Sequence, residues 1–274
     1  MLTDLLLDFA FGCLAGVLSG LFGVGGGAVL VPFLVWQFGR QGFPEGTLMV
    51  AAVATSLATI VVTGTSSMLA HHRRGAVHWP TVAQLLPGIL LGSLAGSSIA
   101  ERLPVEVFKV VFAAFLIIIA VRMLMAGRHH GERPRPGRLG MASAGAGIGT
   151  ASTIVGIGGG SLTVPFLERR RYSIREAVAI SSALGVPIAL AGTAGYVLLG
   201  WDYRGLPEHS LGYVYWPAAA AIVAGSVPFA PLGASLAHRL PTARLKHWFA
   251  VVLIGIGGKM LWPAVIAGLR GMLV

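Results

Sequence analysis

Long apolar runs alternate along the chain with short polar stretches, and their lengths predict its elements. A helix rises about 1.5 Å per residue, so about 20 residues are needed to cross ~30 Å of hydrocarbon. Two apolar runs, 29–38 and 162–168, are too short for that. The longer runs are 4–22, 48–70, 80–100, 106–126, 140–156, 176–200, 213–237 and 245–268. The pattern predicts an all-α polytopic membrane protein.

Each short run follows a glycine-rich break, and the two breaks share one sequence. Residues 20–34 read GLFGVGGGAVLVPFL and residues 153–167 read TIVGIGGGSLTVPFL, with eight identical positions among the fifteen. Glycine and proline both interrupt helices. Because the same interruption occurs twice, we interpret it as an element of the architecture.

The similarity between the two halves extends beyond the breaks. GAVHWP at 75–80 corresponds to GYVYWP at 212–217, an offset of 137 residues. Between the halves lies a polar stretch rich in proline and glycine, which is typical of a linker. The chain therefore reads as an internal duplication. We expect a first transmembrane repeat at 1–127, a cytoplasmic linker at 128–138 and a second transmembrane repeat at 139–274.

Composition supports a bundle of membrane helices. Hydrophobic residues make up 55% of the chain and charged residues 11%, as in membrane-spanning proteins. Twenty Lys and Arg against ten Asp and Glu give a formal net charge of +10. Basic loops that face the cytoplasm explain such an excess. We therefore expect membrane lipid around the chain and no nucleic-acid partner.

The distribution of Lys and Arg favours re-entrant hairpins at the breaks. If each broken segment turns back, thirteen basic residues fall on one side and five on the other; if each crosses, the split is eight to ten. Arg122 and Lys259 are left out because they lie within helix ends. The positive-inside rule favours the hairpins, with both termini outside and the linker inside. The halves are then inverted repeats, each a re-entrant broken-helix hairpin plus three transmembrane helices.

The residue types at the breaks suit an anion, and inverted-repeat transporters hold their substrates at such breaks. Glycine lets a ligand approach the backbone closely, and free N–H groups at a helix start attract negative charge. We expect Pro32 and Pro165 in the first turn of the short helices. Hydroxyls near the breaks can donate to anion oxygens. The candidate substrate-binding residues are Gly25, Gly26, Gly27, Gly158, Gly159, Gly160, Ser161, Thr55, Ser56, Ser181 and Ser182.

Structural interpretations of the same residues stay open. The glycine triplets could be helix kinks alone, and helical hydroxyls often bond to the carbonyl one turn back. Gly12, Gly16 and Gly20, at four-residue spacing, predict close helix packing. The run His71–Arg74 either anchors a helix end at the interface or forms a vestibule that concentrates anions.

The acidic residues fall in predicted loops, at helix ends or near the N-terminus, so we expect no buried carboxylate relay. That absence favours an anionic substrate over a metal cation. No cluster of His, Cys or carboxylates has metal-ligand spacing, and no Ser–His–Asp set can be assembled. We expect no catalytic residues, no metal, no cofactor and no enzyme activity.

A glycine triplet followed four residues later by VPFL in both halves, with HHRRGAVHW at 71–79, resembles the TauE/SafE sulfite exporter family. The resemblance covers nearly the whole chain. It implies a carrier in the bacterial inner membrane for sulfite or a small organosulfonate such as sulfoacetate. One departure is AISSALG at 179–185, where the family commonly has a Thr-Ser pair like Thr55-Ser56.

We therefore expect a multi-pass transporter that exports a small anion by alternating access between two inverted repeats. The alternatives are another small anion, a cation bound by the backbone of the broken helices, or a membrane-embedded scaffold. A scaffold would not need mirrored breaks. The sequence is compatible with a homo-oligomer and does not specify the solute or the coupling ion.

Overall fold

The computed structural model describes residues 2–22, 26–124, 136–237, 247 and 250–261, most of them helical. The helices are α1 (Leu2–Phe22), α2 (Gly27–Arg40), α3 (Glu45–Arg73), α4 (Trp79–Arg102), α5 (Val105–Leu124), α6 (Arg138–Val155), α7 (Gly160–Glu168), α8 (Ile174–Leu199) and α9 (Trp216–Ala237). A further helical segment covers Ala250–Leu261. Strands β1 (Ser210–Leu211) and β2 (Val214–Tyr215) form an antiparallel pair before α9.

The predicted helices are confirmed where the structure describes them. Within the described residues, α1, α3, α4, α5 and α8 are long and apolar enough to cross a membrane, so the chain is a multi-pass membrane protein. The short helices α2 and α7 have 14 and 9 residues, which is too few for a crossing. The β1–β2 pair was not predicted, and the run at 245–268 lies only partly within the described residues.

The positions of the two prolines correct the expectation from the sequence. Helices α2 and α7 begin at Gly27 and Gly160, so Pro32 and Pro165 lie inside the helices and not in their first turns. The helix begins at the third glycine of each triplet, earlier than the apolar pattern indicated. Because proline has no N–H, the carbonyl four residues before each one lacks its helical donor.

Helices α1 and α2 run in opposite directions and form a hairpin. Ring stacking places Phe33 against Phe11 with 3.6 Å between centroids. Further along, Gln37 Nε2 donates to the main-chain oxygen of Asp4 at 3.2 Å. The end of α2 therefore lies beside the start of α1.

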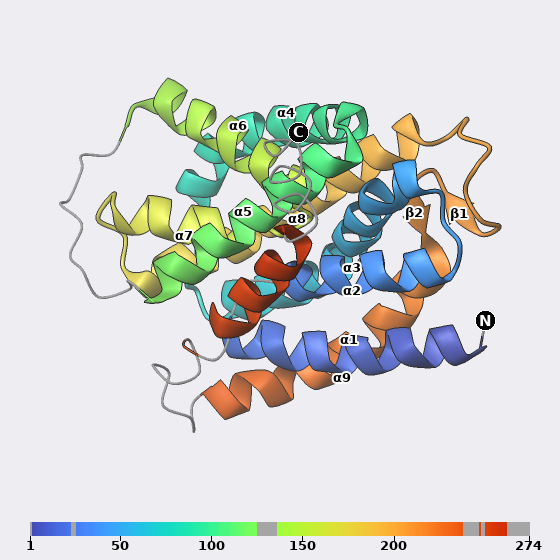
Figure 1. Cartoon of the computed structure of the whole chain (residues 1–274). Coiled ribbons are helices and arrows are strands. Elements are labelled where there is room, and N and C mark those ends of the chain that lie inside the picture. The colour runs from blue at the N-terminus through green and yellow to red at the C-terminus, as the bar shows by residue number, and fades with distance from the viewer. Residues whose placement is uncertain (1, 23–25, 125–135, 238–246, 248–249, 262–274) are drawn as a thin grey trace, which may run out of the picture.

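Helices of opposite halves pair with each other. Helices α3 and α8 pack together in the centre, while α1 packs along α9 and α4 packs along α6. Figure 1 shows α1 and α9 side by side at one edge of the molecule and α4 and α6 at the opposite edge. The first long helix of each half, α1 or α6, thus packs against a helix of the other half.

Glycines allow these pairs to approach closely, as the four-residue spacing predicted. A β-carbon at Gly12 would collide with the carbonyl oxygen of Ile222, and one at Gly145 would collide with that of Leu85. Gly145 follows Gly12 by 133 residues and Ile222 follows Leu85 by 137, the offsets of the duplicated sequence. The same contact therefore occurs twice: α1 of the first half packs on α9 of the second, and α6 of the second half packs on α4 of the first. Gly16 also packs against α9, whereas the surroundings of Gly20 lie outside the described residues.

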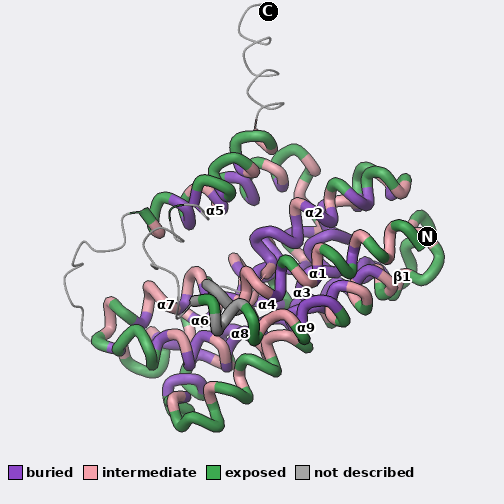
Figure 2. The backbone as a smooth tube through the Cα atoms, turned by 90° about the horizontal axis from the view of Figure 1, so that it is seen from below, coloured by how far each residue is buried: buried purple, intermediate pink, exposed green. Residues whose placement is uncertain are grey.

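The interior is apolar and centres on α2, α3 and α8. Figure 2 shows buried residues along these inner helices, while α5 exposes its outward side. About two thirds of the most apolar part of α3 is buried, against one third for α5. A helix that is apolar on its exposed side faces lipid in a membrane protein, so α5 lies at the periphery.

Candidate functional site

The second glycine break ends one helix and begins the next. Gly156, with φ +71°, ends α6: its N–H donates to the carbonyl of Thr153 (3.3 Å), and the N–H of Ile157 donates to that of Ser152 (3.0 Å). This Schellman arrangement requires a left-handed residue, which glycine supplies with least strain. Gly159, with φ +77°, is the N-cap of α7. Both glycines are therefore needed for the shape of the break.

The start of α7 carries polar groups with unused hydrogen-bonding capacity. The carbonyl of Gly159 accepts the N–H groups of Leu162 (3.1 Å) and Thr163 (2.8 Å). The N–H groups of Gly160 and Ser161, the first two residues of α7, have no acceptor within the helix. The hydroxyls of Ser161 and Thr163 are buried and have no hydrogen-bond partner among the described residues. The positive end of the helix dipole lies here too, which favours an anion.

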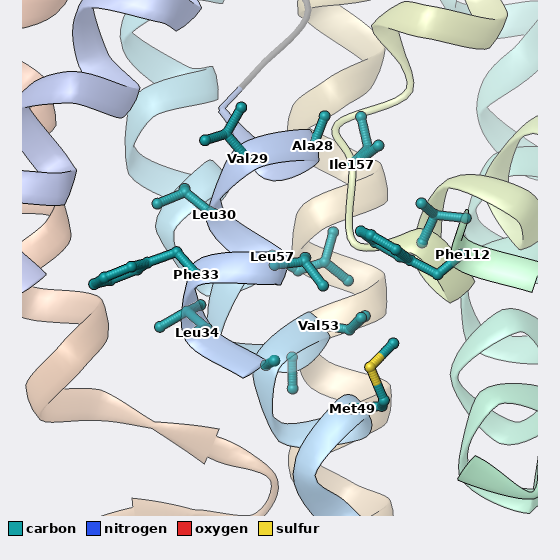
Figure 3. Packing of buried hydrophobic residues seen from close by; sticks show 14 of the residues in the cluster. Ala28, Val29, Leu30, Phe33, Leu34, Met49, Val53, Leu57, Phe112 and Ile157 are labelled. Carbon is teal, nitrogen blue, oxygen red and sulfur yellow. The ribbon is translucent and has the colours of Figure 1, made fainter. Parts of the chain in front are cut away.

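The two breaks touch each other. A β-carbon at Gly27, the first residue of α2, would collide with the carbonyl oxygen of Gly156. The same oxygen accepts the hydroxyl of Ser56 on α3 at 3.0 Å. Figure 3 shows Ile157, in the segment between α6 and α7, beside Ala28 at the start of α2. The end of the first break and the start of the second therefore meet in the interior of the protein.

A cavity of about 510 Å³ lies between α1, α3 and α9 and reaches Gly26 at the first break. His71 and Arg74, at the end of α3, also line it, and none of the described lining residues is acidic. The hydroxyl-bearing residues of the wall are Ser19, Thr59, Thr63, Ser66, Ser67 and Ser226. We call this space the hydroxyl cavity.

A smaller pocket of about 60 Å³ adjoins the hydroxyl cavity and reaches the second break. The two spaces share Ser19, Ile60, Thr63 and Ser67. Across the pocket, the hydroxyl of Ser67 on α3 lies 3.4 Å from that of Ser182 on α8. The remaining lining residues of the pocket are Gly64, Gly158, Gly160, Ser181, Ser182 and Gly185. The pocket, which is lined by α3 and α8, therefore lies between the hydroxyl cavity and the start of α7.

The predicted site residues fall into two groups. The structure brings together Gly26, Gly158, Gly160, Ser181 and Ser182 around these two adjoining spaces. Gly27 and Gly159 support the backbone of the breaks, Ser161 follows at the start of α7, and Gly25 lies outside the described residues.

Thr55 and Ser56 are not among the residues that line either space. Both are fully buried on α3. The N–H of Tyr215 donates to the hydroxyl of Thr55 at 3.0 Å, and Ser56 donates to Gly156 as described above. Both hydroxyls therefore hold α3 to the other half of the chain.

Sequence reasoning missed most of the hydroxyl cavity, although a signal for it was present. Thr59, Thr63, Ser66, Ser67, Ala70, His71 and Arg74 line the cavity from one helix. Their spacing of three and four residues marks one face of a helix. A polar stripe of this kind within an apolar run of membrane-spanning length indicates a face turned away from lipid.

Asp8 is a buried carboxylate within a membrane helix, whereas from the sequence we placed it near the N-terminus and expected no buried carboxylate relay. It lies within the first candidate membrane span, its side chain is 1% exposed, and neither carboxylate oxygen has a hydrogen-bond partner among the described residues. The sequence placed it near a chain end, but α2 and α9 fold against this part of α1 and cover it.

Comparisons with known proteins agree with these observations. A family model described as "Sulfite exporter TauE/SafE" matches residues 8–260. A probable membrane transporter protein of Haemophilus influenzae is 38% identical over 95% of this chain and 99% of its own length. Probable membrane transporter proteins of Methanocaldococcus jannaschii and Bacillus subtilis are 26% and 28% identical, over 95% and 93% of this chain and 96% of each relative. No solved structure gives a significant match.

Proposed function

The chain belongs to the TauE/SafE sulfite exporter family, and we propose that it exports a small anion across the bacterial inner membrane. The substrate we propose is sulfite or a small organosulfonate. The relatives are named as membrane transporters, and transport rather than catalysis is the function we assign.

The observation that carries this proposal is the hydroxyl cavity. It joins a basic end, at Arg74, to the glycine breaks, and no described lining residue is acidic. Positive charge at one end of a channel raises the local concentration of anions. The cavity volume of about 510 Å³ leaves ample room for an oxyanion with its water, since a water molecule occupies about 30 Å³ in the liquid.

Neutral donors would hold the anion weakly enough to release it. Thr59 donates to the carbonyl of Ser56 (2.7 Å) and Thr63 donates to that of Thr59 (3.1 Å). To bind an anion these hydroxyls must rotate away from the backbone, and each exchanged bond is worth about 1 kcal/mol net. The N–H groups at the start of α7 need no such exchange. Binding is therefore strongest where the pocket meets Gly160.

Alternating access between inverted repeats is the mechanism we propose. Two observations support this mechanism. Glycines bring α1 close to α9 and α6 close to α4 in corresponding contacts, and the basic residues are unevenly distributed along the chain. We propose 1–127 and 139–274 as the two repeats and 128–138 as a cytoplasmic linker. Rocking of one repeat against the other would open the breaks to each side in turn.

A melting-shift panel tests the substrate and its site together. Purified protein is heated with sulfite, sulfoacetate, thiosulfate or sulfate, and separately with divalent cations. A ligand that binds the folded state raises its stability by about 2.7 kcal/mol at 100 times Kd. We expect sulfite or sulfoacetate to raise the melting temperature, and an effect of cations alone would overturn the anion assignment.

Of the two glycine substitutions at the breaks, Gly26→Ala and Gly159→Ala, the first is the better test of where the anion binds. Gly26 has φ −62°, and its added methyl would lie 3.3 Å from Ala15 Cβ and 3.4 Å from Leu30 Cδ1, both in the cavity wall. Gly159→Ala is unsuitable, because φ +77° and Ile188 oppose any side chain there. We expect Gly26→Ala to reduce the anion-induced shift and Gly46→Ala, where a β-carbon meets nothing within 4 Å, to preserve it.

Flux in proteoliposomes separates transport from binding. Vesicles loaded with the stabilising anion should release it only when they contain the protein, and Gly26→Ala should slow the release. Binding without flux would support the scaffold alternative and would contradict a transporter.

A further inference from the structure

Asp8 has the surroundings of a carboxyl group that binds a proton. Its two carboxylate oxygens and Gln37 Oε1 are buried acceptors, and none has a hydrogen-bond donor among the described residues. Gln37 faces Asp8, and a hydrogen bond donated by its amide would favour the ionised carboxylate; in the structure Nε2 donates instead to the main-chain oxygen of Asp4 at 3.2 Å. An ionised carboxylate without donors is costly in a membrane interior. A proton on Asp8 removes the charge and supplies the missing donor, since the O–H can bond to Gln37 Oε1.

Few charged or titratable groups face Asp8 from the described elements packed against it. Asp4 lies one turn earlier on α1, and Tyr215, at the end of β2, is close enough that Asp8 and Asp4 contribute to its raised pKa, after burial. Helix α2 offers neutral Gln37, with Arg40 nearly a turn further on and stacked on a tryptophan. Helix α9 has no titratable side chain. The surroundings therefore contain no described cation that pairs with Asp8.

The position of Asp8 connects it with the hydroxyl cavity. Gly12, Gly16 and Ser19 follow Asp8 on α1 at intervals of four, four and three residues, which places them on one helix face. Gly12 and Gly16 pack against α9, and Gly16 and Ser19 line the cavity. A change of charge at Asp8 therefore acts on the helix face that forms the cavity wall.

We infer that Asp8 binds the proton whose movement is coupled to that of the anion. The inference rests on the proposed transport function and adds the coupling ion. The proton enters from water on one side, binds one carboxylate oxygen, and leaves to the other side after the conformational change. A metal cation fits less well: Ca²⁺ takes about six to eight oxygen ligands, and the described residues form no group of three or more His, Cys, Asp or Glu that could hold one.

The flux experiment compares Asp8→Asn with wild type and with Asp4→Asn as the matched control. Asparagine resembles the neutral acid, so we expect the variant to fold and to keep its anion-induced melting shift. A gradient of one pH unit should drive up to about ten-fold anion accumulation for one proton per anion in wild type and in Asp4→Asn. In Asp8→Asn the pH gradient should drive no accumulation, while exchange of anion for anion continues.

Infrared difference spectra between about pH 6 and about pH 9, an interval in which exposed Asp and Glu side chains stay ionised, test the proton site without any anion. We expect a carboxylic-acid C=O band, shifted in heavy water, in wild type and in Asp4→Asn but not in Asp8→Asn. If all three proteins show the same band, or if Asp8→Asn still accumulates anion under a pH gradient, the inference is wrong. A sodium gradient that replaces the pH gradient would likewise overturn it. Failure of every anion in the melting panel would instead remove the transport proposal, and the infrared result would still decide whether Asp8 binds a proton.

Discussion

The carbonyl oxygen of Gly156 occupies the position that a β-carbon on Gly27 would need. The end of α6 and the start of α2 therefore meet with backbone against backbone. Ser56 adds a hydrogen bond to the same oxygen from α3. Three segments from both halves of the chain thus converge on one peptide group, and the glycine there is required by contact rather than by dihedral angle.

Gly27→Ala should destabilise the protein more than any surface glycine substitution. Overpacking of an interior costs about 1–3 kcal/mol, which corresponds to a fall of several degrees in melting temperature. Thermal unfolding in detergent measures the change. Gly46→Ala is the control, because it should leave the melting temperature equal or slightly higher. An equal effect of both substitutions would contradict the contact between the breaks.

The hydroxyl pair Thr55-Ser56 on α3 and the pair Ser181-Ser182 on α8 should have different roles. Ser56→Ala leaves the buried carbonyl of Gly156 without its side-chain donor, at a cost of about 1–3 kcal/mol, and should lower stability more than anion affinity. Ser181→Ala, in the pocket wall, should weaken anion binding with little change in the melting temperature of the free protein. Melting curves with and without sulfite measure both effects. The reverse pattern would show that the hydroxyl assignment is mistaken.

Arg74→Gln should weaken anion transport at low ionic strength. A unit charge a few ångströms from the substrate in water contributes about 1 kcal/mol, or about a five-fold change in apparent affinity. Salt screens this contribution, so the difference should shrink at high ionic strength. Arg73→Gln is the matched control, since Arg73 is adjacent in sequence but does not line the cavity. Identical effects of the two variants would argue for a purely anchoring role.

Cysteine labelling tests the inversion of the repeats. Arg73, at the end of α3, and Glu208, after α8, are exposed and follow helices that correspond in the two halves. In a Cys13→Ser background, an impermeant thiol reagent should label Glu208→Cys from outside and Arg73→Cys only from the cytoplasmic side. Labelling of both from the same side would mean that the repeats are parallel.

Tyr213 should make stability depend on alkaline pH. Its hydroxyl donates to Glu101 on α4 at 3.1 Å, and burial, with the nearby carboxylate, raises its pKa from 10.0 to about 12. The unfolded state therefore loses this proton first, so the contribution is complete below pH 10 and is lost as pH rises toward 12. Tyr213→Phe should melt lower at neutral pH and lose less stability over that interval. Parallel melting curves for the two proteins across it would refute the assignment.

The helices were predictable from the sequence because the length of an apolar run determines whether it can cross a membrane. The positions of Pro32 and Pro165 were not, because the motif does not reveal that each helix begins at the third glycine. The burial of Asp8 depends on α2 and α9, which reach it from distant parts of the chain. Thr55 is similar: its polarity is visible in the sequence, but its partner, Tyr215, lies 160 residues away.

The first long helix of each half packs on a helix of the other half, and this packing has a consequence for the origin of this chain. In a single, unduplicated repeat, the first long helix would lack its partner helix unless two identical polypeptides assembled. Joining the two proposed repeats in one chain makes that association permanent and lets each repeat mutate separately. Asp8 and Gln37 show the result: at an offset of 133 residues their counterparts are Met141 and Arg170. A buried Asp–Gln pair in one copy only is possible in a fused chain and impossible in a symmetric homodimer.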